Sequence, residues 1–147
     1  PVGQITATIT VELQGRTNHA DNAHLKISPH DSIIPVYENA NLTLDSSGTT
    51  TLNVDLMDGN YNIRLKPDYY LSAKLMNISL ADFDSLNFGT LRGGDLDNNN
   101  IVNDQDFNYL ANHWNSTTDQ LADINKDERV NTGDFVVIDS NWFRQGN

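Results

Sequence analysis

The chain has 147 residues, contains no cysteine and carries a formal net charge of −11. The missing thiols exclude disulfides and thiolate-bound zinc, and the acidic balance argues against nucleic acid or an anionic membrane surface as a partner. No apolar run approaches the roughly 20 residues that span a bilayer, so we expect no membrane insertion. Because the chain starts at Pro1 rather than Met, we expect it to be part of a larger protein.

Residues 1–92 show the pattern of an all-β domain. In residues 4–13, apolar residues alternate with polar ones, as in a strand with one buried face. Asp58-Gly59 is a favourable sequence for a tight turn, and we predict that it closes a hairpin. Seven or so short strands predict an antiparallel, immunoglobulin-like sandwich. The strands are expected at 4–13, 24–28, 32–37, 41–44, 49–56, 61–65, 69–80 and 86–91.

The strand pattern ends after Leu91, where Gly93-Gly94 interrupts the chain. We therefore predict two small domains, a β domain at 1–92 and an α-helical domain at 94–147. Because the junction is so short, the two domains are expected to pack against each other. The second domain is too small to bury a large apolar core, so a bound metal would add stability that the core alone does not supply.

Apolar residues spaced three and four apart predict two helices in the second domain, at 106–114 and 134–143. A shorter helix is expected at 117–122. Trp114 and Trp142 continue the apolar spacing of the two main helices, and we predict that they anchor the core.

Residues 95–106 and 123–134 repeat one another at a constant offset of 28 residues, without a gap. In both copies Asp or Asn occupies positions 1, 3, 5, 9 and 12, Phe follows directly, and Trp stands eight residues after the last Asp. The acidic excess gathers here as well. Residues 1–93 carry six Lys or Arg against ten Asp or Glu, whereas residues 94–147 carry three against ten.

Oxygen side chains at alternate positions of a twelve-residue loop are what calcium requires, with a backbone carbonyl at position 7 and position 9 often acting through water. Oxygen donors without His or Cys favour calcium over zinc or copper, and we predict two calcium ions. Isolated turns rich in Asp and Asn are the alternative, but two copies in register with their helices favour the metal sites. The predicted ligands are Asp95, Asp97, Asn99, Ile101 (carbonyl), Asn103 and Asp106, then Asp123, Asn125, Asp127, Arg129 (carbonyl), Asn131 and Asp134.

Both loops depart from the common calcium-loop scheme at two positions. Position 12 is Asp rather than Glu, so the backbone must approach the ion more closely. Position 6, normally Gly, is Asn100 in the first loop and Glu128 in the second. Asn tolerates positive φ well, whereas Glu does so at a cost on the order of 1 kcal/mol. We expect both loops to bind and the second to be more strained.

Val102 and Val130 at position 8, Asn103 and Asn131 at position 9, and a single helix after each loop resemble a dockerin more closely than a calmodulin-like EF-hand protein. The resemblance covers about residues 94–145. It implies docking onto a cohesin module in a secreted or cell-surface protein of a cellulosome-like assembly. Any polysaccharide context would come through the parent protein. Residues 1–92 resemble, more loosely, the immunoglobulin-like X module that often precedes a dockerin. The stretch 58–67 also resembles the prealbumin-like repeats of surface proteins, and either resemblance implies a stabilising or spacing role.

The dockerin resemblance also implies where a cohesin would make contact, at positions 10 and 11 and on the helix that follows. The corresponding residues are Asp104, Gln105, Ala111 and Asn112, then Thr132, Gly133, Asp139 and Ser140. The Ser-Thr pair and basic helix residues of the best-known type are missing here. The two sets also differ from one another, so a symmetric dual mode of binding is not expected and the cohesin type stays open.

Two other classes of function fit the sequence less well. A carbohydrate-binding or adhesion module with structural calcium sites would use Tyr69 and Tyr70 as a platform for sugars, but we expect one of them to face the core. An enzyme is not predicted, because the chain shows no nucleophile–base motif. The neighbouring Asp82 and Asp84 are explained by a solvated turn.

Overall fold

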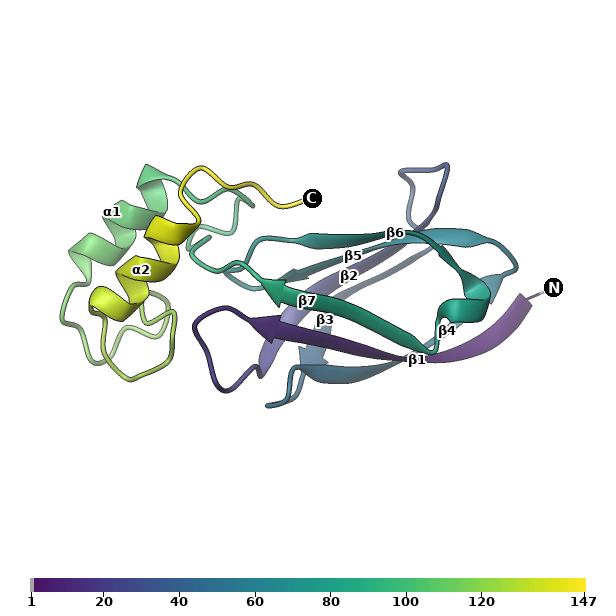
Figure 1. The fold of residues 1–147 in the computed structure, drawn as a ribbon, viewed down its shortest axis with the longest axis horizontal. Coiled ribbons are helices and arrows are strands. Elements are labelled where there is room, and N and C mark those ends of the chain that lie inside the picture. Colours follow the sequence, from purple (N-terminus) through teal and green to yellow (C-terminus); the bar gives the residue numbers. More distant parts are fainter. Residues whose placement is uncertain (1) are drawn as a thin grey trace.

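The computed structural model describes residues 2–147, with the backbone alone for Val2. Seven strands form two packed sheets, and two α-helices lie at the end of an elongated molecule opposite to the start of β1 (Figure 1). The elements are β1 (Val2–Leu13), β2 (Asp21–Pro29), β3 (Tyr37–Leu44), β4 (Thr49–Met57), β5 (Asn60–Pro67), β6 (Ala73–Ser79), the short 3-10 helix η1 (Leu80–Asp82), β7 (Ser85–Leu91), α1 (Asp104–Asn112) and α2 (Thr132–Ser140).

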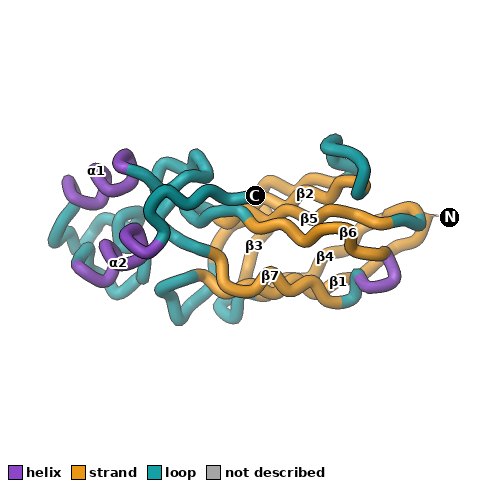
Figure 2. The backbone as a smooth tube through the Cα atoms, turned by 45° about the horizontal axis from the view of Figure 1, so that its top comes forward, coloured by secondary structure: helices purple, strands orange, loops and turns teal. Residues whose placement is uncertain are grey.

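The sandwich consists of sheets with the strand orders β4-β1-β7 and β3-β2-β5-β6 (Figure 2). Alternate residues of each strand point between the sheets, where Ile9, Leu25 and Ile63 are fully buried. The predicted β-sandwich is confirmed. The prediction that it is purely antiparallel is wrong, because β1 and β7 run parallel. β6 belongs to the other sheet, so the connection from β6 through η1 to β7 crosses from one sheet to the other. β7 therefore does not form a hairpin with β6.

The hairpin predicted at Asp58-Gly59 is also wrong. β4 pairs with β1, whereas β5 pairs with β2 and β6, so this turn carries the chain from one sheet to the other. A hairpin and a turn that connects two sheets can have the same local sequence, namely a tight turn between two strands in which polar and apolar residues alternate. Only the pairing partners, which are distant in sequence, distinguish them.

Two predicted strands are shorter than expected. Residues 32–36 form a loop, in which Pro35 lacks a main-chain N–H and Ile33 is 98% exposed, and β3 begins only at Tyr37. The strand expected at 69–80 is interrupted at its start, because Tyr69 has a φ of 63°. β6 therefore covers only the second part of that range.

α1 and α2 begin two residues earlier than predicted, because each is capped by the last residues of the loop before it. The Asn103 side chain accepts a hydrogen bond from Gln105 N (2.8 Å), and the Asp106 carboxylate accepts one from Asn103 N (2.8 Å). The Asn103 side chain also accepts a hydrogen bond from the Asp106 main chain, and the two reciprocal contacts between Asn103 and Asp106 form a capping box. The second helix repeats the arrangement. The loop and the helix that follows it are thus one structural unit.

A second apolar core lies between the helices and uses positions 2, 8 and 16 of each repeat. It contains Leu96, Val102 and Leu110 of the first copy, Ile124, Val130 and Ile138 of the second, and Leu71 from the sandwich side. The prediction that Trp114 and Trp142 anchor this core is wrong, since they are 44% and 38% exposed. Each helix ends two residues before its tryptophan, so the helical spacing does not extend that far.

The short helix predicted at 117–122 is replaced by turns. The Asp119 carboxylate accepts hydrogen bonds from Leu121 N (3.0 Å) and Ala122 N (2.7 Å), which offers the backbone an alternative to a helical turn. Among the described residues, no helix has both the length and the apolar character needed to cross a membrane.

The sandwich and the helical half are in direct contact around the Gly-Gly junction. The Gln14 side-chain oxygen accepts hydrogen bonds from Asn141 Nδ2 (2.6 Å) and Gly93 N (3.2 Å). The Tyr70 hydroxyl donates to the main-chain oxygen of Gln14 (2.8 Å). A Cβ atom at Gly93 would lie only 3.0 Å from the Tyr70 ring, so glycine allows the two halves to approach.

Candidate metal centres and the helical face

Each repeat brings three carboxylates together directly before a helix. Within each group one oxygen from each carboxylate lies within 4.8 Å of the other two, and two of the three residues are buried. The groups are Asp95, Asp97 and Asp106 in the first loop, and Asp123, Asp127 and Asp134 in the second. The sequence predicted all six as ligands, and the structure places each set around one point.

The backbone of each loop turns around its first aspartate. Asp95 Oδ2 accepts a hydrogen bond from Asn100 N, and Asp123 Oδ2 accepts one from Glu128 N, both at 3.0 Å. Both donors lie at position 6 and have positive φ, 70° and 73°. The sharp turn usually made by glycine is therefore made by Asn in one loop and by Glu in the other.

Burial raises the pKa of Asp106 and of Asp134, although main-chain N–H groups bonded to both carboxylates act in the opposite direction. Their ionised forms are thus disfavoured unless a cation lies close. Asp95 is an independent indication of a cation site, because its Oδ1 is buried and has no hydrogen-bond partner within the described chain. Calcium fits both loops, since they offer only oxygen donors and the ion would offset the buried negative charge.

The other predicted ligands lie in the same two loops. Asn99 Nδ2 donates to Asp97 Oδ2 (2.8 Å), and Asn125 Nδ2 donates to Asp127 Oδ2 (3.1 Å). The side chains of Asn103 and Asn131, at position 9, cap the two helices. The Arg129 carbonyl accepts a hydrogen bond from Asn131 Nδ2 (3.0 Å). As calcium ligands, the amides and the two carbonyls remain predictions.

The last residues of the chain run beside the first loop and not beside the second. Ile101, a predicted carbonyl ligand, forms a β-bridge with Gln145. Gly146 N donates to the Asn100 carbonyl at 3.0 Å. The first loop is therefore held from two directions, by its own helix and by this returning segment.

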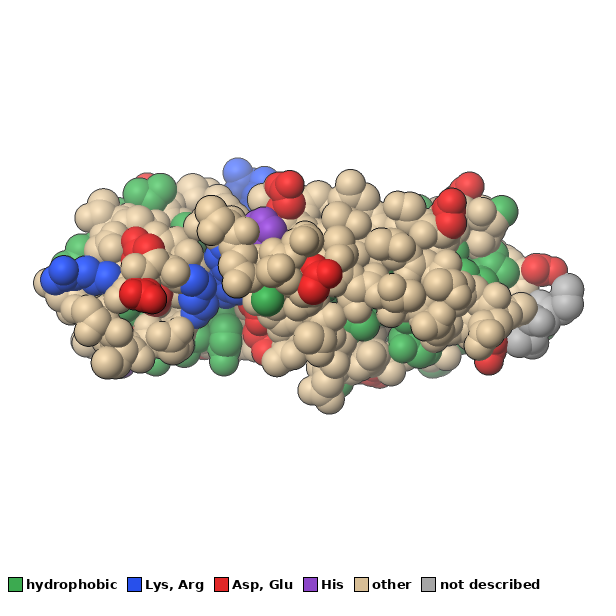
Figure 3. Space-filling model, turned by 90° about the horizontal axis from the view of Figure 1, so that it is seen from below, with side chains coloured by type: hydrophobic (Ala, Val, Ile, Leu, Met, Phe, Trp, Pro, Cys, Tyr) green, Lys and Arg blue, Asp and Glu red, His purple; other side chains and the backbone are tan. Residues whose placement is uncertain are grey.

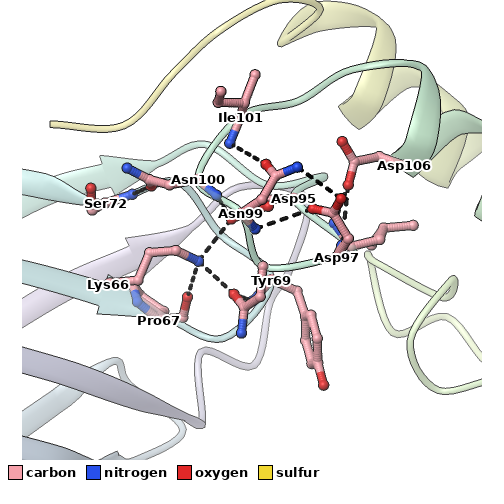
Figure 4. Close-up of polar contacts among 12 residues, drawn as sticks. Lys66, Pro67, Tyr69, Ser72, Asp95, Asp97, Asn99, Asn100, Ile101 and Asp106 are labelled. Atoms are coloured by element: carbon pink, nitrogen blue, oxygen red, sulfur yellow. Dashed lines mark hydrogen bonds and ion pairs between the residues drawn. The ribbon is translucent and has the colours of Figure 1, made fainter.

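A lysine from β5 reaches the first carboxylate group (Figure 4). Lys66 Nζ lies 2.8 Å from Asp95 Oδ2 and 2.6 Å from Asn98 Oδ1, and its side chain is 11% exposed. In the second loop both Asp123 oxygens accept main-chain N–H groups instead. Sequence reasoning missed this contact, because the lysine belongs to the sandwich and nothing near it marks a metal loop.

Replacement of Lys66 by methionine is expected to destabilise the protein most strongly without calcium. The buried Asp95 carboxylate then loses its ammonium partner, at a cost of about 3 kcal/mol. A bound calcium ion would supply positive charge to the same carboxylate, so the loss should be smaller with calcium present. Denaturant unfolding in EDTA and in calcium measures both values.

Lys126→Met is the matched control, because Lys126 Nζ contacts the carbonyl of Gln120 rather than a carboxylate. It should lower stability little, and by similar amounts in both conditions. An equal loss for Lys66→Met with and without calcium would contradict the expected charge sharing at Asp95.

Exposed aromatic side chains extend across both helices. Phe107 and Ala111 lie one turn apart on α1, and Trp114 follows two residues after the end of that helix. The Phe107 ring makes edge contacts with Phe135 (6.0 Å) and Trp142 (6.3 Å). We call these five residues the aromatic face. A groove of about 380 Å³ is lined by the first four of them. Clustered apolar groups of this kind on a soluble protein indicate a binding surface.

Most of the predicted partner contacts are exposed, but the two repeats are not equivalent. Exposed positions are Asp104, Gln105, Ala111, Asn112, Thr132, Asp139 and Ser140, whereas Gly133 is half-buried. Ser140 Oγ accepts a hydrogen bond from Gln14 Nε2 of the sandwich (3.3 Å). The surface beside α1 is therefore the more open one. Sequence reasoning identified Ala111 there, but assigned its aromatic neighbours to the core.

The surface charges are dispersed on the side of the molecule shown in Figure 3. Basic side chains there are separated from one another, near the helical half and the junction, and acidic side chains are scattered along the molecule. This side offers no continuous basic surface to a polyanion.

No protein-family model and no curated protein matches the chain. Solved structures do match. One is a chain from a type II cohesin–X-dockerin complex of Acetivibrio cellulolyticus, an N-terminal interface mutant, with a TM-score of 0.75 and 16% identity over 96% of this chain and 97% of that one. A C-terminal interface mutant of that complex gives a TM-score of 0.71 at the same identity and coverage. The likeness spans sandwich and helices, so the fold is that of an X module followed by a dockerin.

Proposed function

We propose that this chain is a calcium-dependent docking module of a secreted or cell-surface protein, and that its helical half binds a cohesin. The aromatic face carries the proposal, because it is exposed in a fold that covers 97% of a chain from a cohesin–X-dockerin complex. A cohesin partner explains why side chains suited to a core lie on the surface.

Calcium, when bound, offsets the negative charge of each loop. The residues of the chain then transmit loop closure to the helices. Asp106 Oδ1 accepts a hydrogen bond from Leu96 N (2.6 Å) at the start of the loop, while its Oδ2 caps α1 through Asn103 N. One carboxylate therefore fixes both the loop and the first turn of the helix. The position of each helix in turn sets the aromatic face.

The binding energy should concentrate on the α1 side of the aromatic face. Phe107 lies at its centre, between the rings of Phe135 and Trp142, and Trp114 lines the groove with it. Large aromatic anchors in a groove supply most of the affinity in many protein interfaces. On the α2 side, Ser140 already contacts the sandwich.

For the β-sandwich we propose a supporting and spacing role without catalysis. The sugar platform considered at Tyr69 and Tyr70 is not formed, because Tyr70 is fully buried and its hydroxyl contacts the Gln14 carbonyl. Burial also raises the Tyr70 pKa to about 12, which fits a structural hydroxyl. Among the sandwich residues that the structure describes, no contact favours carbohydrate binding over protein docking.

Calorimetric titration with type I and type II cohesins, in calcium and in EDTA, tests the proposal. We expect binding of at least one cohesin with a Kd below about 1 μM in calcium, and no measurable binding in EDTA. A calcium-loaded chain that binds no cohesin contradicts the assigned partner. Binding that persists in EDTA contradicts the mechanism, and retention on a polysaccharide gel without cohesin binding would favour the carbohydrate alternative.

A further inference from the structure

The first loop touches the β-sandwich through two residues that are not predicted calcium ligands, Asn98 and Asn100, of which Asn100 is labelled beside Ser72 in Figure 4. Asn98 Oδ1, at position 4, accepts a hydrogen bond from Tyr69 N (3.0 Å). Asn100 Oδ1, at position 6, accepts one from Ser72 N (2.9 Å). The lysine described above adds a contact to the position-4 oxygen. All three donors belong to one segment, residues 66–72, which leads from β5 towards β6.

The same two asparagines form the turn of the loop. Asn98 and Asn100 have φ values of 63° and 70°, and their side chains reach the sandwich from this conformation. The surroundings of the second contact are crowded, since a Cβ atom on Gly146 would lie 2.2 Å from Asn100 Oδ1. Ser72 is only 5% exposed, so its N–H depends on this partner rather than on bulk water. Turn and contact therefore form together.

The second loop lacks these contacts at the corresponding positions. Lys126 at position 4 and Glu128 at position 6 have the same positive φ, but both are exposed. Lys126 Nζ donates to the Gln120 carbonyl, within the helical half. The sandwich meets this loop at position 2, where Arg16 Nε donates to the Ile124 carbonyl (3.1 Å).

We propose that calcium at the first site is coupled to the packing of the sandwich on the helical half through Asn98 and Asn100, and that the second site lacks this coupling. The inference rests on the calcium binding proposed above. Calcium stabilises the turn from which both side chains reach the sandwich, so the free energy of the contacts adds to calcium binding. Coupling is reciprocal, so calcium at this site must also strengthen the junction.

Matched glycine substitutions at position 6 of the full chain separate this coupling from the intrinsic preference of the loop. Glycine accepts positive φ in both loops, so neither Asn100→Gly nor Glu128→Gly should disturb the turn itself. Only Asn100→Gly removes a contact to the sandwich. We expect it to weaken calcium binding at the first site about fivefold, the effect of one hydrogen bond. Glu128→Gly should change the second site by less than about twofold.

Calcium titrations followed by NMR resolve the two sites, because the position-6 amide in each loop donates to the first aspartate and reports on its own site. Amide exchange at Ser72 gives a second readout. Calcium should slow this exchange in the wild-type chain and in Glu128→Gly, but not in Asn100→Gly. If Asn100 had a structural role without coupling, calcium would affect Ser72 exchange in Asn100→Gly as it does in the wild-type chain.

The outcomes separate the two proposals. Equal effects of the two substitutions on their own sites, or Ser72 exchange that ignores calcium in the wild-type chain, would overturn the coupling and leave calcium binding intact. A wild-type chain that takes up no calcium would overturn the proposed function as well.

Discussion

Replacement of Asp134 by alanine is expected to unfold the helical half and to leave the β-sandwich folded. The Asp134 carboxylate is fully buried and accepts hydrogen bonds from Asn125 N (3.1 Å) and Asn131 N (2.8 Å). The substitution therefore removes a predicted ligand, the closure of the loop and the cap of α2 at once. We expect a loss of about 4 kcal/mol, since two partly buried N–H groups lose their partner and calcium binding fails.

Circular dichroism at 222 nm and amide spectra of the sandwich would show which half unfolds. Asp139→Ala is a suitable control, because it removes an exposed carboxylate from the same helix. It should change stability by about 0.5 kcal/mol or less. EDTA should lower the stability of the helical half in the wild-type chain by less than Asp134→Ala does, because the Asp134 hydrogen bonds remain. A helical half whose stability falls with neither the substitution nor EDTA would contradict the role given to calcium.

Combined replacement of Phe107 and Trp114 by alanine is expected to abolish cohesin binding while the chain stays folded. Both side chains are more than a third exposed, at 37% and 44%, so little core is lost and stability should fall by about 1 kcal/mol or less. Removal of two central aromatic anchors should weaken binding by at least about 100-fold. Calorimetry with the cohesin that binds the wild-type chain measures this.

Met76→Ala provides the comparison, because Met76 is an exposed apolar side chain on β6, away from the helices. Its affinity for cohesin should equal that of the wild-type chain. If the double variant still binds within about threefold of wild type, the aromatic face is not the docking surface and the α2 side must be examined instead.

The carboxylate groups could be predicted from sequence because calcium loops are local. Their ligands lie within twelve residues, so the spacing from Asp95 to Asp106 alone places the oxygens around one point. The duplication then makes a chance pattern improbable. The sandwich was accessible for a similar reason, since alternation along each strand is a local signal of one buried face.

What could not be predicted depends on contacts between distant segments. Phe107 and Leu110 both suit a helix core, and the choice between them depends on how the two repeats pack. The spacing of Phe107, Ala111 and Trp114 is the same for an exposed stripe as for a buried one, so it could not identify the aromatic face. The contact of Lys66 with Asp95 had no such signal, because it joins a strand to a loop across the junction.

The end-to-end contact of the two halves also determines how far the molecule extends. The start of β1 and the helices α1 and α2 lie at opposite ends of the long axis (Figure 1), and Asn141 donates a hydrogen bond to Gln14 across the junction between the two halves. A module joined rigidly to the start of β1 would thus be held at a fixed distance and orientation relative to a partner docked on the helices. Its local concentration near a shared target would then follow from geometry rather than from the statistics of a flexible tether.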